Sequence, residues 1–261
     1  FENWYPGYSN YSEYRGSMHI LYEQSRMAED GVRRPEGTVQ TYMESVHHQF
    51  VSTMANLQSL ATHSQAMYRD YWDGRKYNVS AKSKFANKSY VILANDNHSR
   101  MAALVERLDA QGIEMLTNDI PLKVARATTM LGGEKRGFTI PEGSLIIPNR
   151  QPDAPLVAAI LEFDAKVRKS VLVEERQRTL RDGSSLMYDT TAWNLSMMYG
   201  LPAVTVPEYL NQGLRPWQRA APSIDVAAEA IAWSVSGDDD HSVAFAARLM
   251  ESGVQVRIID K

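Results

Sequence analysis

Glu23 is the acidic side chain whose surroundings most suggest chemistry. It ends the mostly apolar run Met18–Glu23, and the loop upstream carries the turn-forming sequence Tyr5-Pro6-Gly7-Tyr8. The run predicts a mostly buried strand. A carboxylate at the end of such a strand is unfavourable to bury unless it is paired or used in catalysis. The residues alone leave two interpretations open, a catalytic carboxylate or a strand-end charge that reaches solvent, and they favour the second.

Histidine spacing argues against a zinc site built by this chain. A zinc hydrolase needs three protein ligands and an open fourth position, and neither His-x-x-Glu nor His-Glu-x-x-His occurs. His19 and Glu23 share one face of the expected strand, but about 13 Å separates two residues at that spacing. His47, His48 and His63 fall on an expected helix, where we predict solvated side chains. We therefore expect no metal ion to bind this chain on its own.

Two polar turns, Asn95–His98 and Asp238–His241, follow predicted strands and precede predicted helices. α/β folds place ligands at such strand ends. Acidic side chains there are also good helix N-caps and interact favourably with the helix dipole, and we favour capping at both turns. The sequence has no Gly-x-Gly-x-x-Gly, Gly-x-x-x-x-Gly-Lys or Gly-x-Ser-x-Gly motif, so nucleotide binding and serine-esterase chemistry lack their usual support.

Composition limits the classes to which this protein can belong. Its 261 residues are 44% apolar and 23% charged, which is ordinary for a globular chain of one or two domains. A net charge of −3 provides no basic surface for nucleic acid. No run approaches the roughly 18 apolar residues needed to span a membrane. Because cysteine is absent, thiol nucleophiles, thiolate metal sites and disulfides are excluded.

A long amphipathic helix is the clearest predicted element. Apolar residues recur at three- and four-residue spacing from Tyr42 to Tyr71, which places them on one stripe of a helix. Thr41-x-x-Glu44 has the form of a capping box at its start, although Thr38 is an alternative start. Asp73-Gly74 predicts its end. The polar stretch that follows predicts a linker and a domain boundary.

The predicted domains are 1–73, a linker at 74–88, and 89–261. The second domain opens with a strand–helix–strand unit, for which the pattern predicts a parallel strand pair and a right-handed crossover. A similar unit recurs near the end of the chain, and Gly112 and Gly253, which stop the two helices, lie 141 positions apart (253 − 112). We interpret 90–116 and 230–259 as a possible internal duplication.

The patterns predict an α/β fold whose second domain is layered and Rossmann- or flavodoxin-like. The elements of its two similar units are strands Tyr90–Ala94, Ile113–Leu116, Ala230–Val235 and Val254–Ile259, with helices Met101–Ala110 and Ser242–Glu251. Between them we predict a strand at Ser144–Ile147, helices at Asp153–Phe163 and Thr190–Met198, and a connector from Pro207 to Pro222.

The stretch Tyr5-Pro6-Gly7-Tyr8-Ser9, followed by Gly16–Gln24, resembles the end of the catalytic domain in zinc metallocarboxypeptidases of the carboxypeptidase A-like superfamily, especially its long bacterial members. In that family a Tyr-bearing loop leads to a turn of small residues and then to a strand ending in the catalytic Glu. Helix Thr41–Trp72 is similar to the C-terminal helix that packs on the peptidase sheet. Gly143–Pro148 and Tyr188–Leu195 resemble the accessory α/β region of the long members.

The resemblance implies a peptide substrate and roles for three residues. Glu23 matches the Glu that takes a proton from zinc-bound water and passes it to the leaving amine. Tyr5 or, as second choice, Tyr8 matches the Tyr that closes over the substrate, and the spacing leaves both open. In the family, the metal ligands precede this stretch. We therefore expect this chain to be a fragment, cut at both ends from a longer zinc enzyme. The fragment alone should bind no zinc and be inactive.

Other functional classes stay open. One is a non-catalytic module that holds a small ligand or carbohydrate at its strand ends, or a degenerate pseudo-peptidase. An amidotransferase-like domain is disfavoured because the chain has no cysteine nucleophile. The resemblance further implies export from a bacterial cell, either to the periplasm or outside it.

Overall fold

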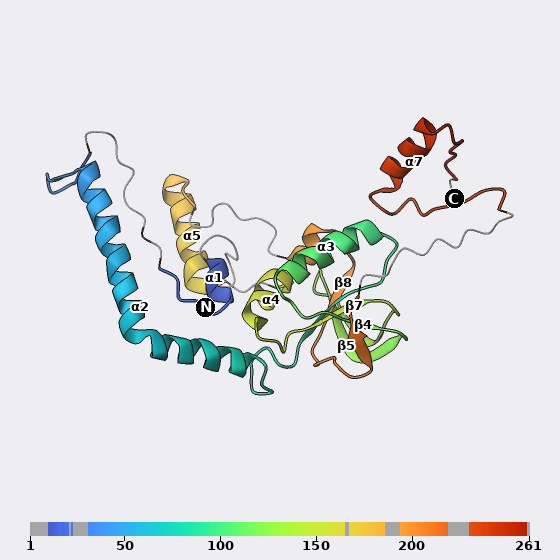
Figure 1. Cartoon of the computed structure of the whole chain (residues 1–261), viewed down its shortest axis with the longest axis horizontal. Helices are drawn as coiled ribbons and strands as arrows, with labels where there is room; N and C mark the ends of the chain where they lie inside the picture. The colour runs from blue at the N-terminus through green and yellow to red at the C-terminus, as the bar shows by residue number, and fades with distance from the viewer. Residues whose placement is uncertain are drawn as a thin grey trace. The chain divides into compact units, whose positions relative to one another are not determined.

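The computed structural model describes residues 10–20, 22, 31–164, 167–185, 194–218 and 230–259. The chain divides between Tyr77 and Asn78 into two compact units. The first contains helix α1 (Asn10–Tyr14), strands β1 (Val32–Arg33) and β2 (Val39–Gln40), and most of the long helix α2 (Tyr42–Asn78). Figure 1 traces the elements along the chain.

Helix α2 starts at the predicted capping box but ends later than predicted. The Thr41 N–H donates to Glu44 Oε2 at 2.7 Å, and the Glu44 N–H donates to Thr41 Oγ1 at 3.2 Å. The predicted end at Asp73-Gly74 is wrong, because the helix continues to Asn78. A helical glycine costs only about 1 kcal/mol relative to alanine. Arg75 and Lys76 follow Gly74 in the last turn, where basic side chains interact favourably with the helix dipole.

The predicted strand Met18–Glu23 is wrong over the residues that can be tested. Met18, Ile20 and Tyr22 are exposed, at 66%, 62% and 40%, and none of them lies in a strand. Leu21 and Glu23 lie outside the described residues. Tyr22 contacts α2 instead of a sheet, since its hydroxyl donates to Asn56 Oδ1 at 3.2 Å. Within the described part of the chain no strand pairs with this segment, so its apolar side chains have no sheet to cover.

The apolar stripe of α2 is present but uncovered by described residues. Its members are 49–63% exposed: Tyr42, Val46, Phe50, Met54 and Leu57. The helix buries only one residue, Ser45, among those described. The sequence pattern therefore gives the helix correctly, while the described residues provide no core for its stripe.

The second unit is built on a seven-stranded sheet in the order β6-β5-β8-β3-β7-β4-β9, in which neighbouring strands are antiparallel. The strands are β3 (Ser89–Ile92), β4 (Leu116–Asn118), β5 (Leu122–Thr129), β6 (Glu134–Ile140), β7 (Leu145–Pro148), β8 (Ala203–Val206) and β9 (Leu214–Pro216). The helices are α3 (His98–Ala110), α4 (Ala154–Leu161), α5 (Lys169–Asp182), α6 (Leu195–Met198) and α7 (Ser242–Glu251).

The chain is thus mixed α/β, but the expected Rossmann- or flavodoxin-like parallel sheet is wrong. Strands β3 and β4 run in the same direction, as the crossover requires, yet they are not neighbours. Strand β7 lies between them and is antiparallel to both, with Tyr90 opposite Ile147 and Thr117 opposite Leu145. The sequence of one crossover unit does not reveal which distant strand inserts between its two strands.

The central strands are buried on both faces, which explains why they read as continuous apolar runs. Tyr90 and Ile92 of β3 pack with α3 and α4 in one core cluster. Val91, between them, packs in a second cluster with Val124 and Ile140 of the β5–β6 hairpin. Figure 1 shows α3 and α4 beside the sheet. A hairpin that covers the second face produces the same burial pattern as the second helix layer of a parallel fold.

Several other predictions are tested by the described elements. Strand β7 and helices α3, α4 and α7 are confirmed. Strand β4 starts later than predicted, at Leu116, and helix α6 covers only the end of its predicted range, of which 190–193 lie outside the described residues. Helix α5, strand β8 and the β5–β6 hairpin were not predicted, and the predicted connector contains β9.

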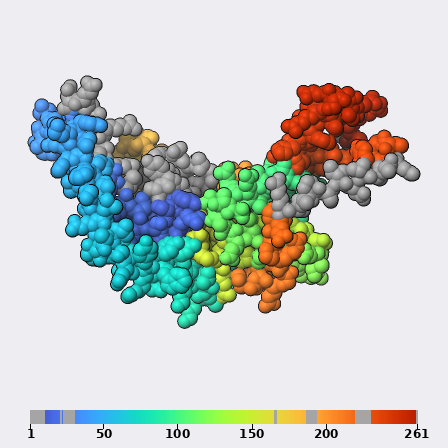
Figure 2. All heavy atoms as spheres, viewed as in Figure 1, coloured from blue at the N-terminus to red at the C-terminus, as the bar shows by residue number. Residues whose placement is uncertain are grey.

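The second strand–helix–strand unit is only partly formed. Helix α7 has the predicted bounds, but 230–235 and 254–259 contain no strand. Ile231 and Ile258 are 104% and 95% exposed, and no residue of 230–259 is buried. Figure 2 shows this segment, coloured orange to red. The two segments lack a described sheet partner, and an unpaired strand leaves its backbone groups unsatisfied.

No described helix is sufficiently long and apolar to cross a membrane.

The β5–β6 hairpin gives a small stability prediction. Arg126 and Arg136 lie directly opposite each other, both are exposed, and neither forms an ion pair with a described residue. Like charges at opposite positions are destabilising. Arg136→Glu should therefore raise the free energy of unfolding by about 0.2–1 kcal/mol in urea denaturation. Arg136→Gln is the control, and a Glu variant no more stable than the Gln variant would show that the pair does not interact.

Candidate functional site

The turn between β3 and α3 is shaped by two asparagines. The Asn97 N–H donates to Asn95 Oδ1 at 3.0 Å, and the Arg100 N–H donates to Asn97 Oδ1 at 3.1 Å. Asn97 is therefore the N-cap of α3, as its side-chain type predicts. The turn leaves the N–H of Ser99, in the first turn of α3, directed at a partner outside its own segment.

The turn before α7 is held by an aspartate and a serine. The His241 N–H donates to Asp239 Oδ1 at 2.8 Å, and the Ser242 hydroxyl donates to the Gly237 carbonyl at 3.3 Å. His241 is the N-cap residue of α7, but its side chain makes no capping hydrogen bond. The acidic side chains of this turn are thus available to another part of the molecule.

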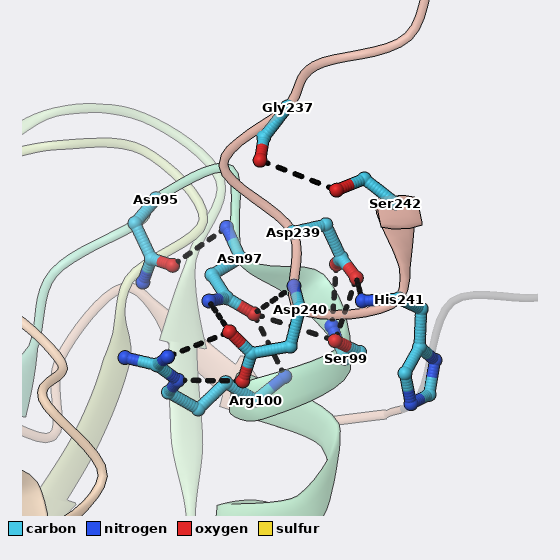
Figure 3. Close-up of polar contacts among 9 residues, drawn as sticks. All are labelled: Asn95, Asn97, Ser99, Arg100, Gly237, Asp239, Asp240, His241 and Ser242. Carbon is cyan, nitrogen blue, oxygen red and sulfur yellow. Dashed lines mark hydrogen bonds and ion pairs between the residues drawn. The ribbon is translucent and has the colours of Figure 1, made fainter. Parts of the chain in front are cut away.

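These two turns meet and form a polar cluster, which we call the clasp: Asn97, Ser99, Arg100, Asp239 and Asp240 (Figure 3). Asp239 accepts the Ser99 N–H at 2.8 Å through Oδ2 and the Ser99 hydroxyl at 2.6 Å through Oδ1. Arg100 binds Asp240 with two nitrogens, Nε to Oδ2 at 2.8 Å and Nη2 to Oδ1 at 2.6 Å. Asn97 Nδ2 also donates to Asp240 Oδ1, at 3.0 Å.

The clasp makes both carboxylates stronger acids. Hydrogen bonds from the Ser99 hydroxyl and N–H lower the pKa of Asp239 from 3.8 to about 2. Hydrogen bonds from Arg100 and Asn97 lower the pKa of Asp240, and the bond to Asp240 raises the pKa of Arg100. A general acid or base works best with a pKa near the working pH. Asp239 and Asp240 are therefore suited to holding charge near α3, and poorly suited to proton transfer at neutral pH.

Capping is confirmed at the first turn, although the cap is an asparagine and not the predicted acidic side chain, and the prediction is only half correct at the second turn. Asn97 caps its own helix. Asp239 does satisfy a helix N–H, but that N–H belongs to Ser99 of α3 and not to α7. No local signal in the sequence indicates this exchange, because the two residues are 140 positions apart. Ser99 and Arg100 were accordingly missed as partners of the acidic turn.

A cavity of about 420 Å³ adjoins the clasp. Ser99, Arg100 and Ala103 line it from α3, and Asp240 and His241 line it from the acidic turn. The remaining wall, 197–200, contains two methionines and a tyrosine. The cavity thus combines an apolar wall with a polar wall in which Arg100 and Asp240 are paired, and this arrangement can bind a molecule. The Ser99 hydroxyl in its wall donates to Asp239, but the lowered pKa of that carboxylate makes it a poor general base at neutral pH.

The carboxypeptidase resemblance implies roles for three residues, none of which the structure describes. Glu23, Tyr5 and Tyr8 lie outside the described residues. His19, which precedes Glu23, has its Nδ1 at 3.1 Å from Glu13 Oε1.

The histidines of α2 lie on the surface of the helix. His47, His48 and His63 are exposed, so the prediction of solvated side chains is confirmed. Within the described ranges no three His, Asp or Glu side chains are grouped so that they can hold a metal ion.

No family model, curated protein or solved structure matches this chain.

Protonation of Asp239 should weaken the clasp in acid. Because the pKa of Asp239 is lowered in the folded protein, its contribution to stability is fully present above the ordinary value of 3.8 and is lost as the pH falls toward 2. We expect the difference in unfolding free energy between the wild type and Asp239→Asn to be constant above about pH 5 and to shrink below pH 4. Urea denaturation at each pH measures it, and a difference that grows in acid would contradict the assignment.

Proposed function

We propose that residues 1–73 form the C-terminal part of the catalytic domain of a zinc metallocarboxypeptidase, a hydrolase of C-terminal peptide bonds in the carboxypeptidase A-like superfamily. Residues 89–261 would then be its accessory α/β domain. The observation that carries this proposal is the order of the Tyr-Pro-Gly-Tyr loop, the run ending in Glu23, and a long capped helix. The resemblance also favours export to the periplasm or outside a bacterial cell.

The structure supports this order unevenly. Helix α2 has the expected start and exceeds the expected length, and its exposed apolar stripe is suited to packing on a sheet. The segment before it gives no such support, because Met18, Ile20 and Tyr22 form no strand. Glu23 would accept a proton from the attacking water and deliver it to the leaving amine, and Tyr5 or Tyr8 would contact the substrate.

The zinc ligands would be residues outside the described ranges, since no three metal-ligating side chains are grouped within those ranges. The chain of 261 residues should therefore bind no stoichiometric zinc in metal analysis. A longer product of the same gene should contain His-x-x-Glu and a later His, bind one zinc, and hydrolyse a peptide from its free carboxyl end. One tightly bound zinc on the present chain, or a longer product lacking those ligands, would overturn the proposal.

The cavity beside the clasp favours a second candidate, a non-catalytic module that binds a small ligand or carbohydrate, including a pseudo-peptidase that has kept only this role. Its volume, about 420 Å³, lies in the range of small-molecule sites. Thermal-shift screening of a sugar and small-metabolite panel tests this candidate, with Met198→Glu as a variant that alters the apolar wall. Stabilisation that the variant abolishes would favour the module, and no stabilisation by any compound would count against it.

A further inference from the structure

Segment 230–259 is held to the rest of its unit by the clasp. Among the described residues, every hydrogen bond or ion pair from this segment to the rest is made by Asp239 or Asp240. None of its residues is buried, and none belongs to either core cluster. Its attachment is therefore polar, while its large apolar side chains, such as Ile231 and Val243, are left exposed.

The same attachment completes the cavity. Asp240 and His241 line it from segment 230–259, and the opposite walls belong to α3 and to residues 197–200. Separating the segment from α3 removes one wall. The extent of the cavity thus depends on whether the clasp is formed. Figure 3 shows the two turns that meet in the clasp.

We infer that segment 230–259 is a lid, meaning a movable part of the wall of the cavity beside α3, and that the clasp is its latch. Opening the lid separates exposed and half-buried polar groups that water can solvate, and it exposes no core side chain. Because of both properties, we expect the free energy of local opening to be well below the free energy of global unfolding. Exposed ion pairs are also screened by salt, so ionic strength controls the latch.

The absence of cysteine allows the lid to be labelled specifically. Spin labels on Glu106→Cys in α3 and Glu251→Cys in α7 report the separation of the two helices by pulsed electron paramagnetic resonance. We expect one narrow distance distribution at low salt and a broad one when Asp239→Asn and Asp240→Asn are combined. Asp238→Asn is the matched control, since its side chain takes no part in the clasp, and it should keep the narrow distribution.

Hydrogen exchange at the Ser99 amide gives a second readout at the latch itself. Its N–H donates to Asp239, so the double variant should exchange at least about tenfold faster there, while amides of β3 and β7 are unchanged. Unchanged β3 and β7 amides show that the variant is folded. The lid inference would be wrong if the distance distribution stayed narrow in the double variant. It would also be wrong if the wild type at low salt gave an equally broad distribution.

Discussion

If the proposed function is correct, replacing Glu23 by Gln in a longer product that binds zinc should lower kcat for peptide hydrolysis by about 10²–10⁴-fold. Glutamine has nearly the shape of glutamate but cannot accept the proton of the attacking water. Because Glu23 is assigned to proton transfer and not to metal binding, the zinc content should not change. Turnover on a peptide with a free carboxyl end and metal analysis of the same sample measure the two effects.

Glu13→Gln is the matched control for this experiment. Glu13 lies ten positions before Glu23 in the same unit, and its side chain is 42% exposed. We expect this variant to keep wild-type turnover. Undiminished hydrolysis by Glu23→Gln would remove Glu23 from the mechanism, whereas loss of zinc with loss of activity would place it among the metal ligands.

The elements predicted correctly from the sequence are those specified by nearby residues. The start of α2 depends on hydrogen bonds between Thr41 and Glu44, three positions apart. The start of α3 depends on Asn97 and Arg100, also three apart. Such starts can be predicted from residue types at short spacing, because the hydrogen bonds form within a single helical turn.

The arrangement of the sheet was not predictable in the same way. The neighbours of β3 are β7 and β8, which lie more than 50 and 100 residues farther along the chain. Buried runs such as Ser89–Ile92 are typical of parallel sheets, but any strand covered on both faces has this pattern. A signal for the hairpin that covers the second face was present, since Gly132-Gly133 joins β5 and β6.

The candidate site was predicted in its parts and missed as a whole. Both turns were identified, and capping was correctly expected at the first, where the cap is Asn97 and not an acidic side chain. The partner of Asp239 was missed because Ser99 carries no feature that marks it as the recipient of a distant carboxylate. The duplication hypothesis suggested a second sheet unit at 230–259, whereas the described segment uses its turn as a contact and leaves its predicted strands unpaired.

Truncating either of two neighbouring isoleucines in β7 should destabilise the second unit strongly. Ile146 and Ile147 are both fully buried. Ile147 packs in the cluster that contains Leu161 of α4, and Ile146 packs in the cluster that contains Val124 of β5. Each Ile→Ala change removes buried methyl groups and leaves a cavity, for which the expected loss is about 2–5 kcal/mol of unfolding free energy.

The comparison of the two variants tests the architecture, because adjacent residues of a strand point to opposite faces of the sheet. If one face of the sheet were open to solvent, one of the two changes would lower the unfolding free energy by only about 0.5 kcal/mol or less. Leu131→Ala is the matched control, since Leu131 is 95% exposed at the β5–β6 turn and should fall within that same small range. Urea denaturation measures all three variants. If Ile146→Ala behaved like Leu131→Ala, the hairpin would not cover the second face, and the burial that makes β3 and β7 read as continuous apolar runs would need another source.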